Sequence, residues 1–179
     1  YTPTVVWSDY TGVWHMDEEI PAAQAASARS NDSTAQKNYA EPKKGGAATA
    51  NLSQTVSVDG VIGNGRMNSN VASVQNGNRL QTSKSFSTGS VFTFSGFFKM
   101  NAKGNYPRLA GTKSNGNGGD GWSIETTSGS STTLYIRGNG GSNFTLSPNI
   151  DDLTAGWVYM VFVYNGTTAT VYSNGRKIG

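Results

Sequence analysis

The chain has 179 residues and a mass of 18.9 kDa, which is enough for one domain whose core needs neither disulfide bonds nor a structural metal. It lacks cysteine, so disulfides, thiolate metal sites and thiol nucleophiles are excluded. Its net charge of +3 comes from a sparse set of charged residues, 14% of the chain, which argues against a nucleic-acid-binding surface.

The composition is that of an all-β protein. Helical periodicity never lasts three turns, whereas 23 glycines and many Asn, Ser and Thr residues separate short apolar runs. The 4 Trp, 8 Tyr and 7 Phe residues predict an aromatic-rich core. No apolar run approaches the roughly 18 residues of a membrane span, so we expect no membrane insertion. Tyr1 is expected to be a processing site or an artificial boundary.

The first half of the chain mixes strand-like and irregular segments. Residues 13–16 predict an N-terminal strand that reaches the core. Residues 19–54 show no alternation and are expected to form a long irregular insertion. Strands are expected again at 55–61 and 66–74, on either side of a glycine-rich turn.

The second half predicts the main body of the sandwich. Residues 89–100 are the strongest expected strand, with Phe92, Phe94 and Phe98 on the inner face and Phe97 on the outer face. Shorter strands are expected at 109–113, 121–126, 133–137 and 144–146.

Residues 158–179 predict an antiparallel meander, because an Asn165-Gly166 turn and an Asn174-Gly175 turn follow two apolar strands. The chain stops just after the turn that should start a further strand, so we expect the folding unit to extend beyond Gly179. The whole pattern predicts one all-β domain over residues 1–179, a sandwich of two antiparallel sheets.

The order of the motifs resembles the laminin G-like modules of the concanavalin A-like lectin/glucanase superfamily, especially those of bacterial surface proteins. The matching segments are 12–18 (GVWHMDE), 32–34 (DST), 60–65 (GVIGNG), 92–99 (FTFSGFFK), 157–166 (WVYMVFVYNG) and 171–175 (VYSNG). The resemblance implies a jelly-roll sandwich. It also implies a non-catalytic binding or adhesion module of a larger, secreted prokaryotic protein at the cell surface.

The resemblance further implies C-terminal closing strands that this sequence lacks. In the family, a closing strand lies beside the N-terminal one, so its loss would leave the edge at Val13, Trp14, His15 and Met16 unpaired, which proteins avoid. We expect a second polypeptide segment or chain to complete the sheet by strand addition. The alternative is a fold that is completed in some shorter way.

Enzymatic activity is not expected. His15 is the only histidine, and no nucleophile with an orienting carboxylate is marked in the sequence, so a packed strand histidine is the simpler interpretation. The related glucanases place two carboxyl groups about 5–5.5 Å apart with a Glu-x-Asp-x-x-Glu pattern. That pattern is absent here, and Glu125 stands alone on its strand.

Calcium is the cofactor that the loops suggest. Asp32 in the long insertion, and Asn117 and Asp120 in a glycine-rich loop, supply the oxygen ligands that hard cations need. Members of the superfamily often carry calcium at a rim. The alternative is that Asp32 forms an Asx-turn and Asp120 caps a loop.

A carbohydrate ligand would need aromatic platforms beside polar groups at a loop rim. Tyr106 and Trp122 flank such a loop, and Tyr39 lies in the insertion, although Trp122 also suits the core. Arg108 and Arg137 could pair with an acidic sugar. Two functions stay open: a lectin-like binder with rim calcium, and an adhesion module whose main interface is the segment that completes its sheet.

Overall fold

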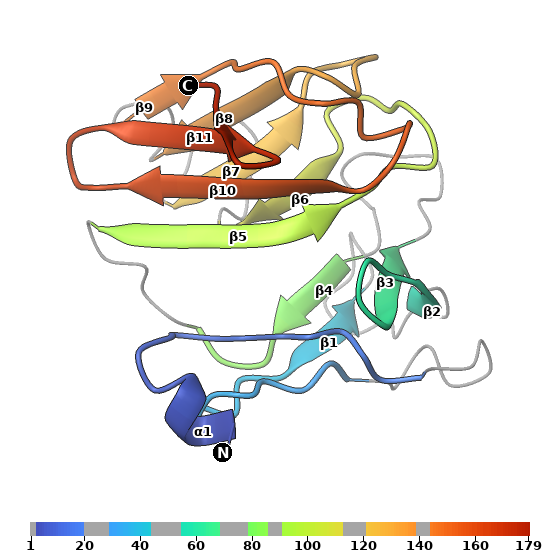
Figure 1. Ribbon diagram of the computed structural model, residues 1–179, viewed down its shortest axis with the longest axis vertical. Helices are drawn as coiled ribbons and strands as arrows, with labels where there is room; N and C mark the ends of the chain where they lie inside the picture. The colour runs from blue at the N-terminus through green and yellow to red at the C-terminus, as the bar shows by residue number, and fades with distance from the viewer. Residues whose placement is uncertain are drawn as a thin grey trace. The chain divides into compact units, whose positions relative to one another are not determined.

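The computed structural model describes residues 3–19, 29–43, 55–68, 79–85, 91–112, 121–138 and 144–179. The chain divides into two compact units, Tyr1–Ser87 and Thr88–Gly179. Figure 1 traces the elements of both. The expectation of a single domain over residues 1–179 stays a prediction.

The second unit contains two four-stranded sheets, with the strand orders β12-β11-β10-β5 and β6-β7-β8-β9. Figure 1 shows β5, β10 and β11 side by side in front of the second sheet. The bounds are β5 Phe92–Phe98, β6 Arg108–Gly111, β7 Trp122–Thr126, β8 Leu134–Gly138, β9 Phe144–Leu146, β10 Val158–Tyr164, β11 Ala169–Ser173 and β12 Arg176–Lys177.

The β10-β11-β12 meander forms as predicted, because its turns contain residues that accept positive φ. Gly166 has φ 90°, and Asn174 and Gly175 have φ 47° and 81°. Asn165 N donates to Thr168 O at 3.1 Å and closes the first turn. These local signals fix where the chain reverses.

The two sheets of the second unit enclose an apolar core. Side chains at alternate positions of β10 are buried, and Met160 and Phe162 are only 3% and 1% exposed. The second sheet contributes Ile124 from β7 and Ile136 from β8 to the same cluster. Each fully buried apolar side chain of this size contributes about 1.5–3 kcal/mol. This cluster therefore holds the sandwich together.

Aromatic rings connect the two sheets across this core. The Trp122 ring centroid lies 5.3 Å from that of Phe92 and 6.2 Å from that of Phe162. Phe144 lies 5.4 Å from Phe162, between centroids. These separations suit favourable ring contacts. The predicted aromatic-rich core is confirmed for this unit.

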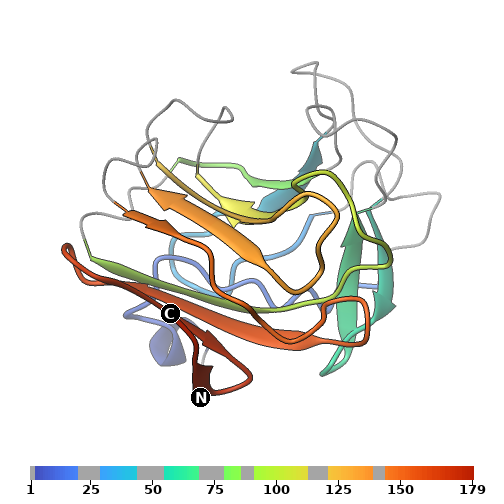
Figure 2. The same cartoon turned by 90° about the horizontal axis from the view of Figure 1, so that it is seen from above.

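The first unit contains short elements: α1 Pro3–Val6, β1 Ala40–Lys43, β2 Thr55–Asp59, β3 Asn64–Asn68 and β4 Arg79–Thr82. β1 pairs with β4 and β2 pairs with β3. Figure 2 shows the β2-β3 hairpin in teal. Gly63, with φ 66°, forms its turn together with a 2.8 Å hydrogen bond from Gly60 N to Gly63 O. A turn between these strands was predicted at residues 63–65; it lies at residues 60–63, because Asn64 and Gly65 already belong to β3.

Two expectations for the first unit are wrong. Residues 13–16 form no strand: Trp14 makes a single β-bridge to Asp32, and Met16 has φ 61°, which extended strands do not allow. The insertion 19–54 is not irregular throughout, because β1 lies within it. Its Ala-rich stretch 21–28 lies outside the described residues.

All strand pairs of the described residues are antiparallel. The predicted all-β class with antiparallel sheets is therefore confirmed.

Candidate functional site

The sheet β6-β7-β8-β9 places charged side chains on the face opposite its apolar core. Side chains alternate along β7, so Glu125 points away from the face that carries Ile124. Glu125 lies in register with Arg108 of β6 and with Tyr135 of β8. Arg137 follows on the same face of β8. The fold thus brings together two arginines predicted for an acidic ligand and the carboxylate that looked isolated in the sequence.

These residues form the Arg108–Glu125–Arg137 cluster. Arg108 Nε and Nη2 lie 3.0 and 2.8 Å from Glu125 Oε1, and Arg137 Nη2 lies 3.1 Å from Oε2. The side chains of Glu125 and Arg137 are 5% and 7% exposed, whereas that of Arg108 is 34% exposed. The two guanidinium groups share the two oxygens of one carboxylate. Arg108 is the most exposed member of the cluster.

Tyr135 supports the buried end of this cluster. The guanidinium carbon of Arg137 lies 4.5 Å from the centroid of the Tyr135 ring, within the range of a cation–π contact. Arg137 is therefore fixed between a carboxylate and an aromatic face, which leaves Arg108 as the accessible group.

Tyr106 lies two residues before Arg108 and is 44% exposed. Its φ of 53° is left-handed, a conformation that tyrosine adopts rarely and that costs free energy. The following residue is held to the sheet, because Thr126 N donates to Pro107 O at 3.0 Å. Tyr106 therefore has the exposure that a ligand-stacking residue needs. In the sequence it lies two residues before Arg108 of the cluster.

The other predicted aromatic site residues lie elsewhere. Trp122 is 6% exposed and packs in the core, so its assignment to a surface ligand site is wrong and the core interpretation holds. Tyr39 belongs to the first unit, where the Arg29 guanidinium carbon lies 5.2 Å from its ring centroid.

Asp32 organises a loop of the first unit. Its Oδ1 accepts hydrogen bonds from Val13 N and Thr34 N at 3.0 and 2.9 Å. Its Oδ2 accepts from Thr34 Oγ1 and Asn38 N at 2.8 and 2.9 Å. Burial raises the pKa of Asp32, but the hydrogen bonds from Asn38, Val13 and Thr34 outweigh it and leave the pKa below its usual value.

These contacts bear on the predicted calcium ligand. A carboxylate has about four lone-pair sites, and protein donors already use them on Asp32, which favours the Asx-turn alternative. Asn117 and Asp120 lie outside the described residues. In the described part of the chain, no group of three or more His, Cys, Asp or Glu side chains could hold a metal ion. Calcium binding stays a prediction.

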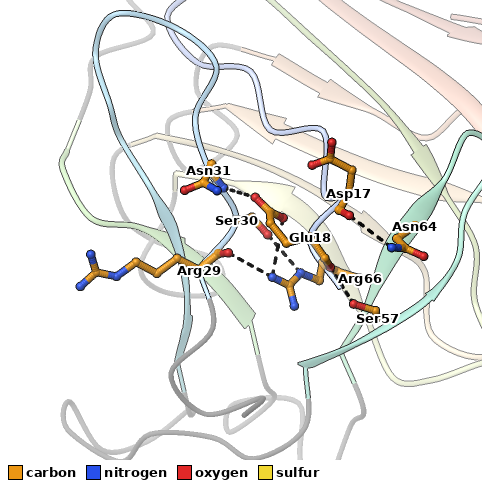
Figure 3. Close-up of polar contacts among 8 residues, drawn as sticks. All are labelled: Asp17, Glu18, Arg29, Ser30, Asn31, Ser57, Asn64 and Arg66. Carbon is orange, nitrogen blue, oxygen red and sulfur yellow. Dashed lines mark hydrogen bonds and ion pairs between the residues drawn. The ribbon is translucent and has the colours of Figure 1, made fainter. Parts of the chain in front are cut away.

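A second polar cluster, which the sequence did not reveal, joins three segments of the first unit (Figure 3). Arg66 of β3 is 3% exposed; its Nη2 lies 3.8 Å from Glu18 Oε2, and its Nε donates to Ser30 Oγ at 3.1 Å. Glu18 Oε1 accepts from Asn31 N, and its carbonyl accepts from Ser57 Oγ at 2.8 Å. Burial lowers the pKa of Arg66, and Glu18 partly offsets this. The cluster ties the segment before residue 20 to the hairpin.

The edge at Val13, Trp14, His15 and Met16 is partly paired within the first unit. Ser33 N donates to Val13 O at 2.8 Å, and Trp14 Nε1 donates to the Asn38 carbonyl at 2.7 Å. The His15 ring lies 5.6 Å from that of Trp7, between centroids. A partner strand at this edge stays a prediction.

Comparison with known proteins gives a family. A model described as the concanavalin A-like lectin/glucanases superfamily matches residues 68–179. The chain belongs to this superfamily. The resemblance to laminin G-like modules is thereby confirmed, whereas the bacterial surface-protein branch stays a prediction. No curated protein and no solved structure matches the chain.

Laminin G-like members of the superfamily are typically non-catalytic modules that bind carbohydrate or protein. The matched residues include all of the second unit and therefore the Arg108–Glu125–Arg137 cluster. No helix in the described residues is long and apolar enough to cross a membrane.

Proposed function

We propose that the second unit is a non-catalytic binding module for acidic carbohydrate, and that Arg108 contacts the carboxylate or sulfate group of the sugar. The observation that carries this proposal is the Arg108–Glu125–Arg137 cluster. Its most exposed member is the Arg108 guanidinium, which is 34% exposed and lies on the edge strand β6.

The chemistry of the cluster suits such a ligand. A guanidinium presents a planar fork of N–H donors that matches a carboxylate or sulfate. Glu125 accepts from Nε and Nη2 of Arg108, which form one edge of the guanidinium, and so orients the other edge. Tyr106, exposed beside it in the chain, supplies the aromatic surface on which the apolar face of a sugar ring can stack.

The same contacts support a non-catalytic role. Both carboxylate oxygens of Glu125 accept hydrogen bonds from guanidinium groups, so Glu125 is engaged as a structural anion. A retaining glycosidase needs a carboxylate free to attack the sugar, and a second carboxyl group about 5–5.5 Å away. We therefore propose binding without turnover.

We also propose an extracellular prokaryotic setting, as part of a larger surface protein; the cysteine-free sequence and the laminin G-like motifs support it. A calcium ion held by Asn117 and Asp120 remains part of the lectin-like alternative. Calorimetric titration with calcium tests it: heat and a raised melting temperature would support the ion, and neither would remove it.

A glycan array that contains uronic-acid, sulfated and neutral oligosaccharides tests the proposed function. We expect binding to the acidic members, a loss of about tenfold or more in affinity for Arg108→Gln, and weakening by salt. Arg176→Gln is the matched control, since it removes the same charge from a side chain of the same unit that is 69% exposed. Equal binding by both variants, or a silent array, would contradict the proposal.

A further inference from the structure

The turn between β10 and β11 carries a sequence motif that the proposed binding site does not use. Residues 165–167 read Asn-Gly-Thr. Asn-x-Ser/Thr, with any residue but proline in the middle, is the acceptor motif for N-linked glycosylation, in which the Asn side chain receives an oligosaccharide. Because so short a motif also arises by chance, its accessibility in the folded chain decides whether it can act.

The sequence contains this motif at four asparagines: Asn31, Asn51, Asn143 and Asn165. Asn51 and Asn143 lie outside the described residues. At Asn31, the middle residue of the motif is Asp32, which is 2% exposed and accepts hydrogen bonds on both carboxylate oxygens. At Asn165, by contrast, all three residues of the motif are exposed. The structure therefore favours Asn165 over Asn31 as an acceptor.

The side chain of Asn165 divides its two polar atoms between the turn and solvent. Its Oδ1 accepts hydrogen bonds from Thr167 N and Thr168 N at 3.0 and 2.7 Å. Among the described residues, no hydrogen bond of Asn165 uses Nδ2, which is the atom that receives the sugar in N-glycosylation. A glycan on Nδ2 therefore leaves the contacts of Oδ1 in place.

The turn is also held by its own backbone, so the motif lies on a defined hairpin. Asn165 N donates to Thr168 O at 3.1 Å, and the Tyr164 hydroxyl donates to Gly166 O at 2.9 Å. Gly166, the middle residue of the motif, has φ 90°, which glycine adopts without strain. Figure 1 shows this turn at the left end of the second unit, where β10 ends and β11 begins.

We propose that Asn165 is a site of N-linked glycosylation. The donor is an oligosaccharide on a lipid diphosphate. Asn165 Nδ2 forms a bond to C1 of the first sugar, and the C1–O bond to the diphosphate breaks. The lipid diphosphate leaves with the electron pair, and one Nδ2 proton passes to a base of the transferase. This modification rests on the secreted setting proposed above but not on the acidic-sugar site.

Export of the chain into the compartment of an oligosaccharyltransferase that accepts the three-residue motif tests the proposal. A carrier protein with an established site, made in the same cells, confirms that the enzyme is active. Mass spectrometry of peptides from the folded, purified protein locates the glycan. We expect a glycopeptide that contains Asn165, and release of the glycan by an amidase marks the site, because it converts the asparagine to aspartate.

Variants of the turn separate the motif from the fold. Thr167→Ala removes the hydroxyl of the motif but keeps the backbone N–H that Asn165 Oδ1 accepts, and is expected to lose the glycan. Asn165→Asp keeps the acceptor oxygen and removes Nδ2, with the same result. Thr168→Ala is the matched control, since it truncates the next exposed threonine outside the motif and is expected to be glycosylated like wild type. Circular dichroism confirms that each variant is folded.

Two results would overturn the proposal: wild type without a glycan on Asn165, or equal glycosylation of Thr167→Ala and Thr168→Ala. A second measurement tests the geometry of the side chain. Glycosylated and unglycosylated wild type are expected to unfold at the same urea concentration, because the contacts of Oδ1 persist. A lower midpoint for the glycosylated form would contradict that placement of Nδ2. Failure of the acidic-sugar proposal would appear in the glycan array and leave these results unchanged.

Discussion

Replacing Glu125 with Gln removes the only carboxylate of the Arg108–Glu125–Arg137 cluster while keeping the volume of the side chain. The Arg137 guanidinium, 7% exposed, then loses its ion pair with Glu125. Breaking a buried pair in this way costs about 3–5 kcal/mol in the free energy of unfolding. The Arg108 contact adds about 0–1 kcal/mol, because that side chain is 34% exposed and partly screened by water.

We therefore expect Glu125→Gln to lower the free energy of unfolding of the second unit by about 3 kcal/mol. Native-state hydrogen exchange at the amides of β7 and β8 measures this locally and does not depend on the first unit. Arg176→Gln breaks an ion pair in which Arg176 is 69% exposed, and is expected to cost about 0–1 kcal/mol. If both variants lose the same small amount, the cluster does not stabilise the sheet.

The remaining predictions address the two units separately. Gly111→Ala would put a Cβ 2.6 Å from Trp122 O, so we expect β6 to separate from β7 at a cost of about 1–3 kcal/mol in a urea titration; a neutral effect would refute this packing. Asp32→Asn leaves the two donors on Oδ2 unsatisfied, so we expect a loss of about 1–3 kcal/mol at pH 7. Because the folded-state pKa of Asp32 lies below the unfolded value of 3.8, its contribution is complete above that pH and is lost as the pH falls through 3.8 towards the folded pKa. The difference between wild type and Asp32→Asn in hydrogen exchange should therefore shrink in acid; a constant difference would contradict the assignment.

Features with a local signal could be predicted from the sequence. The Asn165-Gly166 and Asn174-Gly175 turns set positive φ angles within a few residues and therefore located the C-terminal meander. The alternation in β5 placed Phe97 on the outer face, where it is 45% exposed. The Asx-turn alternative for Asp32 is also local, because the carboxylate accepts hydrogen bonds from Thr34 N and Asn38 N.

Features that join distant segments could not be predicted. The pair of Glu18 and Arg66 and the pairing of β1 with β4 depend on tertiary placement, and neither leaves a periodic pattern in the sequence. The sequence indicated Arg108 and Arg137 as possible ligands of an acidic group but gave no sign that Glu125 lies between them. That geometry depends on how β6, β7 and β8 are aligned with one another. The alignment includes a shift in the pairing of β6 with β7 between Arg108 and Ala110, which the sequence does not reveal.

The central claim is that Arg108 gives the second unit its affinity for an acidic sugar. Calorimetric titration of the wild type, Arg108→Gln and Arg176→Gln with one sulfated oligosaccharide and its desulfated form tests it most directly. The account predicts heat only with the sulfated form, for the wild type and Arg176→Gln, and little for Arg108→Gln. Equal heats for the two forms, or undiminished binding by Arg108→Gln, would contradict it.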